Sequence, residues 1–208
     1  MNELQYIRAQ VALERGHMAS VRLACQQALA LPEGTLPPAE LADFCTRCAL
    51  YLVFIGRRFN AQDQAHADQL RAVPGVTADP AHAALLSDLD ATLARNRRAL
   101  ETLAAALGSA AIEPVADTPS GEAIVAACRE YLAFYEATLA PRRHGLAPLL
   151  EAHYGIAQWR RASQVTADAV MRERELYAQA TGRLPAGVKL PSEAERAAAR
   201  RGVGSNGD

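Results

Sequence analysis

The 208-residue chain is 50% hydrophobic but only 5% aromatic, and its formal net charge at pH 7 is -1. Its 45 alanines and abundant leucines favour helices over strands, so the fold class expected is all-α. The near-zero charge argues against a nucleic-acid partner, and no apolar run is long enough to span a membrane.

Stretches rich in proline and glycine divide the chain into segments with helical periodicity. We expect helices over about 3–30, 39–72, 80–107, 120–154 and 159–181. Asp79 and Pro80 supply an N-cap and first turn for the third helix, and Gly108 its C-terminal stop. Four long helices joined by short loops predict an up-down-up-down four-helix bundle with an additional C-terminal helix. Residues 1–182 are expected to form this single domain, and 183–208 a flexible tail.

Each long segment carries an apolar stripe with steps of three and four residues. Six polar residues interrupt these stripes, namely His17, Gln62, His66, Asn96, Thr138 and Arg142. An unpaired buried polar group is destabilising by about 1–3 kcal/mol, so these residues should meet one another or a ligand. Two interpretations stay open: a polar network that fixes the helix register, and a ligand pocket.

The pocket interpretation combines Gln62, Asn96, Thr138 and Arg142 with the aromatic side chains of Tyr131 and Tyr135. Such a pocket would take a small polar molecule or a small anion. A buried guanidinium at Arg142 needs compensation. It would come from nearby carbonyls, from a bound anion, or from a carboxylate such as Glu136, Asp63 or Glu14.

Four sequence stretches carry a family resemblance: GHMASVRLACQQAL around His17, FNAQDQAHADQLRA over 59–72, LLSDLDATLARNRRALETLAAAL around Asn96, and LAFYEATLAPRRHGLAPLL around Thr138 and Arg142. Over about residues 3–155 the chain resembles hemerythrin-like proteins of the HHE type. The resemblance implies a four-helix bundle with a metal pair, usually iron, in its core. It also implies that the six polar stripe residues stand at the ligand positions of that pair.

The chain departs from the family at those positions. Only His17 keeps the family's residue, and Arg142 replaces a carboxylate with a cation that cannot bind a metal. A diiron site is therefore not expected. A single divalent ion, iron or zinc, held by His17, His66 and Asp63 remains an alternative.

A C-x-x-C motif lies at Cys45 and Cys48. Redox pairs of this kind lie at a helix N-terminus, where the dipole lowers the first thiol's pKa, whereas Cys45 is placed further into its helix. The stripe turns both sulfurs inward, so we interpret them as core residues. Without a second C-x-x-C motif, a structural zinc site is not supported.

We therefore expect a hemerythrin-like bundle with a degenerate metal site that binds a small ligand or responds to metal, and that is a binding protein more than an enzyme. The alternatives are a structural or protein-interaction bundle without a ligand, and an enzyme with one metal ion. The C-terminal helix would allow a homodimer. The absence of a secretory signal and the arginine bias, with Lys189 the only lysine, favour the bacterial cytoplasm.

Overall fold

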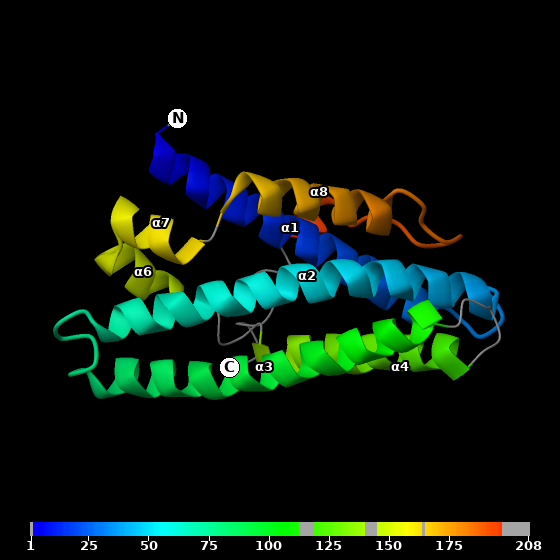
Figure 1. Ribbon diagram of the computed structural model, residues 1–208, viewed down its shortest axis with the longest axis horizontal. Helices are drawn as coiled ribbons and strands as arrows, with labels where there is room; N and C mark the ends of the chain where they lie inside the picture. Colours follow the sequence, from blue (N-terminus) through cyan, green and yellow to red (C-terminus); the bar gives the residue numbers. More distant parts are fainter. Residues whose placement is uncertain (1, 113–118, 140–144, 164, 197–208) are drawn as a thin grey trace.

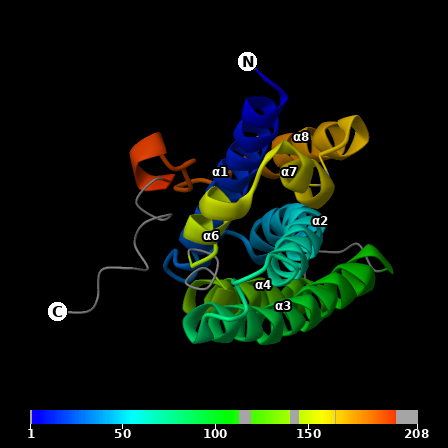
Figure 2. The same cartoon turned by 90° about the vertical axis from the view of Figure 1, so that its left-hand side faces the viewer.

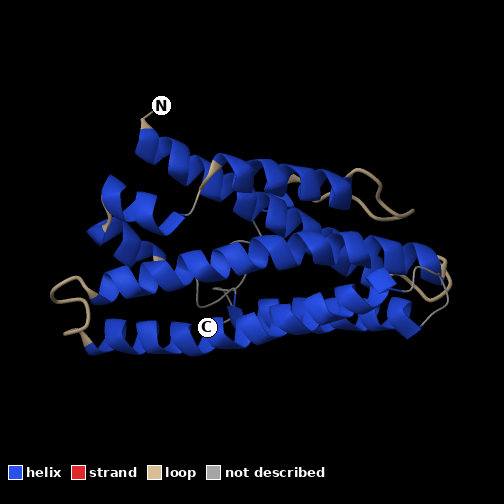
Figure 3. Cartoon of the chain, viewed as in Figure 1, coloured by secondary structure: helices blue, strands red, loops and turns tan. Residues whose placement is uncertain are grey.

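The computed structural model describes residues 2–112, 119–139, 145–163 and 165–196. Throughout these ranges the regular structure is helical and no strand occurs, which confirms the all-α class (Figure 3). The elements are α1 (Glu3–Leu29), α2 (Pro38–Arg71), α3 (Pro80–Ile112), α4 (Pro119–Phe134), the π-helical turn η1 (Tyr135–Leu139), α6 (Ala147–His153), α7 (Ile156–Ser163) and α8 (Ala167–Thr181). None of the helices in the described ranges combines the length and the apolar character that crossing a membrane requires.

Side chains satisfy the exposed amides at the helix starts. Asn2 and Gln5 form a reciprocal capping box at α1, in which each side chain accepts from the other residue's N–H at 2.9 Å. Asp79 Oδ1 accepts from the N–H groups of Ala81 and His82 at 2.8 and 3.3 Å. This contact confirms Asp79 as the predicted cap of α3.

Two predicted helix ends are wrong. Gly108 does not stop α3, which continues to Ile112, because an interior glycine weakens a helix by only about 1 kcal/mol. The expected single helix over 120–154 is divided, since α4 gives way to η1 at Tyr135 and α6 begins only at Ala147. Pro148 occupies the first turn of α6, where a missing N–H is tolerated.

The segment expected as a helix over 159–181 is also two elements, α7 and α8. Thr166 separates them, and its side chain accepts from the Ala169 N–H at 3.2 Å to cap α8. A β-conformation at Thr166 ends the helical geometry locally. A hydroxyl residue at this position favours the cap over the helix interior.

Helix α2 is the centre of the molecule. It contacts α1 and α8 on one side and α3 and α4 on the other, and α7 and α6 also contact it (Figures 1 and 2). The predicted additional C-terminal helix is therefore α8, which packs along α1 and α2. The coarse architecture is a set of long helices packed around α2.

Gly56 marks a close approach on α2. A Cβ at this position would lie 2.8 Å from Leu100 Cδ2 of α3 and 3.2 Å from the Tyr131 hydroxyl of α4. The absence of a side chain thus lets two neighbouring helices press against α2. The core that results is built mainly from Leu and Ala side chains, followed by Val, Cys and Tyr.

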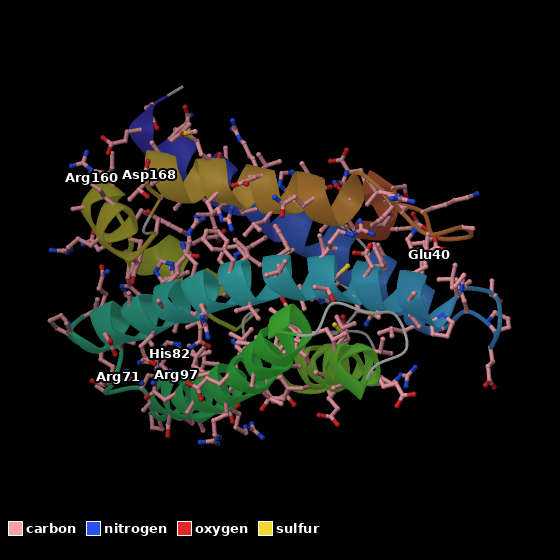
Figure 4. All side chains as sticks on the ribbon, turned by 45° about the vertical axis from the view of Figure 1, so that its right-hand side comes forward. Glu40, Arg71, His82, Arg97, Arg160 and Asp168 are labelled. Carbon is pink, nitrogen blue, oxygen red and sulfur yellow. The ribbon has the colours of Figure 1, made fainter. Side chains whose placement is uncertain are left out.

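Polar contacts fix the two ends of this packing. Arg71, near the end of α2, pairs with Asp90 of α3, and Gln64 also donates to Asp90 at 3.1 Å. In Figure 4, Arg71 lies at the opposite end of the molecule from Glu40, at the start of α2. After α8 the chain returns to α1, where Lys189 N–H donates to the Gln27 side chain at 3.1 Å.

Candidate functional site

The chain's four cysteines come together in the core. Cys25 lies on α1, Cys45 and Cys48 on α2, and Cys128 on α4, and all four are free and 0% exposed. The sulfur atoms of Cys25, Cys45 and Cys128 all lie within 4.8 Å of one another. In the part of the chain that the structure describes, this thiol cluster is the one group of three or more potential metal ligands that converges in this way.

Helix direction explains why these residues meet. Cys25 is near the end of α1, Cys45 is near the beginning of α2, and Cys128 lies just past the middle of α4. The end of α1 and the starts of α2 and α4 lie at the same end of the molecule (Figure 1). Because each cysteine occupies an inward position of its helix, the three thiols project into one shared layer.

Hydrogen bonds within the thiol cluster favour a thiolate at one position. Contacts from Cys128, Cys45 and Cys48 hold the pKa of the Cys25 thiol well below its usual value. Contacts with Cys25 and Cys45, together with burial, raise the pKa of Cys128, and burial raises that of Cys48. Cys128 also donates to the Cys45 carbonyl at 3.5 Å. The arrangement therefore places one sulfur where negative charge is stabilised by neighbouring thiols.

A second buried feature joins α1 to α2. Glu14 is 0% exposed and accepts from Arg58 Nη2 at 2.5 Å and from Gln10 Nε2 at 2.9 Å. Arg58 keeps two further buried nitrogens, Nε and Nη1, without a partner among the described residues. This ion pair is a structural link about three helical turns along α1 from Cys25, and so it is separate from the thiol cluster.

Helix α8 is tied to the same interface through Glu173, which is 0% exposed. Its Oε1 accepts from the Tyr51 hydroxyl at 2.8 Å and lies 2.9 Å from His17 Nδ1. The His17 ring stacks on Tyr177 of α8 with centroids 3.9 Å apart. The predicted metal ligand His17 is therefore held by a carboxylate and an aromatic ring of α8.

His66 lies elsewhere, beneath the segment that carries α6 and α7. The rings of Tyr154 and Trp159 each lie 5.2 Å from its imidazole, and Tyr154 donates to the His66 carbonyl at 3.1 Å. Burial lowers the pKa of His66 to about 4, so the ring is neutral at neutral pH. The nearby Asp63 accepts from Arg15 at 3.1 Å.

The proposed single-ion ligands, His17, His66 and Asp63, do not gather into one ligand set in the structure. His17 faces Glu173, whereas His66 is enclosed by aromatic rings. The ligand set that does converge consists of cysteines, for which the sequence pattern indicates only core packing.

The predicted pocket residues occupy several environments. Asn96 Nδ2 donates to Asn60 Oδ1 at 2.8 Å, and Gln62 is buried with neither amide atom bound to another described group. Tyr131 and Tyr135 pair with ring centroids 6.4 Å apart, and half-buried Thr138 lies in η1. Arg142 falls outside the described residues.

The three carboxylates considered as partners for Arg142 each have another arginine. Glu14 pairs with Arg58, Asp63 with Arg15, and Glu136 with the buried Arg22. Arg22 also lies over the Tyr135 ring, with 3.8 Å between its guanidinium carbon and the ring centroid. These carboxylates therefore already serve contacts between α1 and the elements around it.

Sequence reasoning missed the joint position of the cysteines. A partial signal was present, because Cys45, Cys48 and Cys128 stand on apolar stripes, and an antiparallel arrangement of α1 and α2 brings Cys25, near the end of α1, towards the start of α2. Glu173 was missed too, since its flanking arginines and glutamates indicated a solvated face. Comparison of the chain with protein-family models, curated proteins and solved structures finds no match.

Proposed function

We propose that this protein binds a soft, thiophilic ion through Cys25, Cys45 and Cys128 and acts as a metal-responsive binding protein. The observation that carries the proposal is the convergence of three fully buried sulfurs from three helices within 4.8 Å. Thiolate sulfur prefers soft ions over hard ones such as magnesium or calcium.

The spacing suits direct coordination. A metal–sulfur bond of about 2.3 Å in a tetrahedral zinc–thiolate site separates the sulfurs by roughly 3.8 Å, so small shifts of the thiols would close the site. An ion held there would join α1, α2 and α4 covalently through their side chains. Binding would therefore stabilise the contact of these helices. A change in ion concentration would then change the stability of this part of the fold.

The experiment is a titration of the fully reduced protein with Cd²⁺, followed by the ultraviolet absorption of cadmium–thiolate charge transfer. We expect one ion per chain and a higher melting temperature. Cys128→Ala should lose both effects, whereas His17→Gln, which alters the earlier candidate ligand, should keep the absorption. Absence of the thiolate band in the wild-type protein would overturn the proposal.

A second candidate function is the binding of a small polar molecule beside α2. Its support is that both amide atoms of buried Gln62 and Nδ1 of buried His66, one helical turn further on, have no partner among the described residues. Such atoms are destabilising unless something pairs with them. If a ligand normally does so, Gln62→Leu should abolish stabilisation by that ligand in a thermal-shift screen of small amides and alcohols.

The finer architecture belongs to this proposal as well. Contacts of α1 with α2, α2 with α3, α3 with α4 and α4 with α1 support an up-down-up-down bundle of the hemerythrin-like type. In such a protein the ion-binding function would have moved from the mid-bundle histidine positions to a cysteine layer near one end. Binding rather than catalysis is favoured because the cysteine sulfurs are sealed from solvent.

A further inference from the structure

We infer, building on the proposed function, that the thiol cluster prefers a trivalent thiophilic ion of the arsenite class to a divalent metal ion. The inference depends on three properties of the cluster: the number of its ligands, the charge around it and its burial. Each property is independent of whether the earlier histidine candidates bind metal.

The first property is a ligand number of three. Cys25, Cys45 and Cys128 converge, and no histidine or carboxylate of the described residues joins them. Cys48 is adjacent to Cys25 but is not part of the converging group. Structural zinc sites use four protein ligands, and catalytic ones complete the set with water. Trivalent arsenic instead forms three bonds to sulfur and keeps a lone pair in the fourth direction.

The second property is charge. Three thiolates with a divalent ion carry a net charge of about -1, whereas three thiolates with a trivalent ion are neutral. A net charge buried without a partner is strongly destabilising. Arg47 and Arg129, whose charges act on the thiols of Cys48 and Cys45, do not supply one, because Arg47 pairs with Asp43 at 3.0 Å and Arg129 is exposed to solvent. The buried Arg22, three residues before Cys25, pairs with Glu136.

The third property is burial among apolar side chains. All three cysteines are 0% exposed and belong to the hydrophobic core. Such surroundings favour a compact neutral complex over one that needs water or counter-ions. The core thus discriminates between ions by the charge of the finished complex.

The binding reaction balances without an oxidant or reductant. Arsenous acid, As(OH)₃, exchanges three As–O bonds for three As–S bonds with the three cysteine thiols. Each sulfur loses its proton to a departing hydroxide, so three water molecules are released. Arsenic remains trivalent and sulfur is not oxidised.

Native mass spectrometry of the reduced protein with equimolar arsenite and Cd²⁺ tests this preference. We expect one arsenic per chain, seen as a mass increase of one arsenic atom less the three thiol hydrogens. We also expect arsenite to displace bound Cd²⁺. If Cd²⁺ binds and arsenite does not displace it, the inference fails while the proposed function stands. If neither ion binds, both fail.

Cysteine variants distinguish a three-thiol from a four-thiol site. Cys25→Ala should lose the arsenic adduct, whereas Cys48→Ala, a matched buried cysteine on α2, should keep it. Loss of the adduct in both would overturn the three-ligand assignment. Far-UV circular dichroism checks that both variants remain helical.

A two-thiol reagent makes the test independent of simple damage to the site. Methylarsonous acid, CH₃As(OH)₂, needs two sulfurs, so Cys25→Ala should still bind it through the remaining pair while no longer binding arsenite. A Cys25→Ala protein that binds arsenite as the wild type does, or that binds neither reagent, would contradict the inference.

Discussion

Glu14 and Arg58 place two opposite charges inside the interface of α1 and α2, with side chains that are 0% and 8% exposed. Removing one member of such a pair leaves the other charge buried and unpaired. We therefore expect Arg58→Met to lower the free energy of unfolding by about 3–5 kcal/mol in urea denaturation.

The neighbouring residue provides the control. Arg57 is exposed, and Arg57→Met should change the free energy of unfolding by less than about 0.5 kcal/mol. The double variant Glu14→Gln with Arg58→Met should be less damaging than the sum of its single changes, because neither then strands a charge. Equal effects of the Arg57 and Arg58 changes would show that the ion pair is not buried.

His66 makes folding depend on pH. Its pKa is about 4 in the folded protein because of burial, whereas an unfolded imidazole titrates near 6.5. Between these values the unfolded chain binds more protons, so stability falls as the pH is lowered from about 6.5 towards 4. His66→Gln should reduce the stability difference between pH 7 and pH 4 by about 3 kcal/mol.

Chemical denaturation at the two pH values measures this difference. His153→Asn is the control, because that side chain is exposed and should leave the pH dependence unchanged. If the pH dependence of the His66 variant equals that of the wild type, the imidazole is not desolvated in the folded state.

The stripe pattern in the sequence was sufficient to predict that Gln62, His66 and Asn96 are internal, and all three are 1% exposed or less. Their partners could not be predicted in the same way. Asn96 meets Asn60 because of the register between α2 and α3, and His66 meets Trp159 because the chain turns back after α6. Helical periodicity gives the face of a residue but not what covers that face.

Among the elements, α8 makes its buried polar contacts with α1 and α2 through Glu173, and Arg47 of α2 donates to the Gln179 carbonyl of α8 at 3.2 Å. Glu173→Leu keeps a helix-forming side chain of similar size but leaves the Tyr51 hydroxyl and His17 without their acceptor. An unpaired buried donor is destabilising by about 1–3 kcal/mol. Hydrogen exchange of the α8 amides should therefore accelerate about tenfold or more, ahead of any change in α3.

Glu175, two residues further along α8, gives a matched comparison. It is exposed and its contacts are with Arg172 and Gln179 of the same helix, so Glu175→Leu should leave exchange in α8 close to the wild type. If hydrogen exchange in the Glu173 variant accelerates equally in α3 and α8, then α8 does not open separately from the rest of the molecule, which would contradict the prediction.

Helix content and most helix starts followed from local signals, because caps and proline positions are written in the sequence. The breaks within the expected fourth and fifth helices did not follow from them. A π-helical turn at Tyr135–Leu139 keeps helical side-chain spacing nearly intact, so an apolar stripe continues through it. Element type is thus easier to predict than element continuity.

For the molecule as a whole, the thiol cluster is a property of tertiary structure. The C-x-x-C motif alone indicated core packing, and the structure confirms that Cys45 and Cys48 are buried. The motif gave no indication that Cys25 and Cys128, from two other helices, lie beside Cys45. Residues separated by 83 positions, such as Cys45 and Cys128, become neighbours only through the register of α2 and α4.

The central claim is that the ion-binding group of this protein is made of sulfur. X-ray absorption spectroscopy of the protein with one equivalent of Cd²⁺ tests that claim most directly, because it reports the atoms bound to the ion. The account predicts a shell of three sulfur ligands without nitrogen from His17 or His66. A shell dominated by nitrogen and oxygen would contradict it, and would favour the alternative ion site at His17, His66 and Asp63.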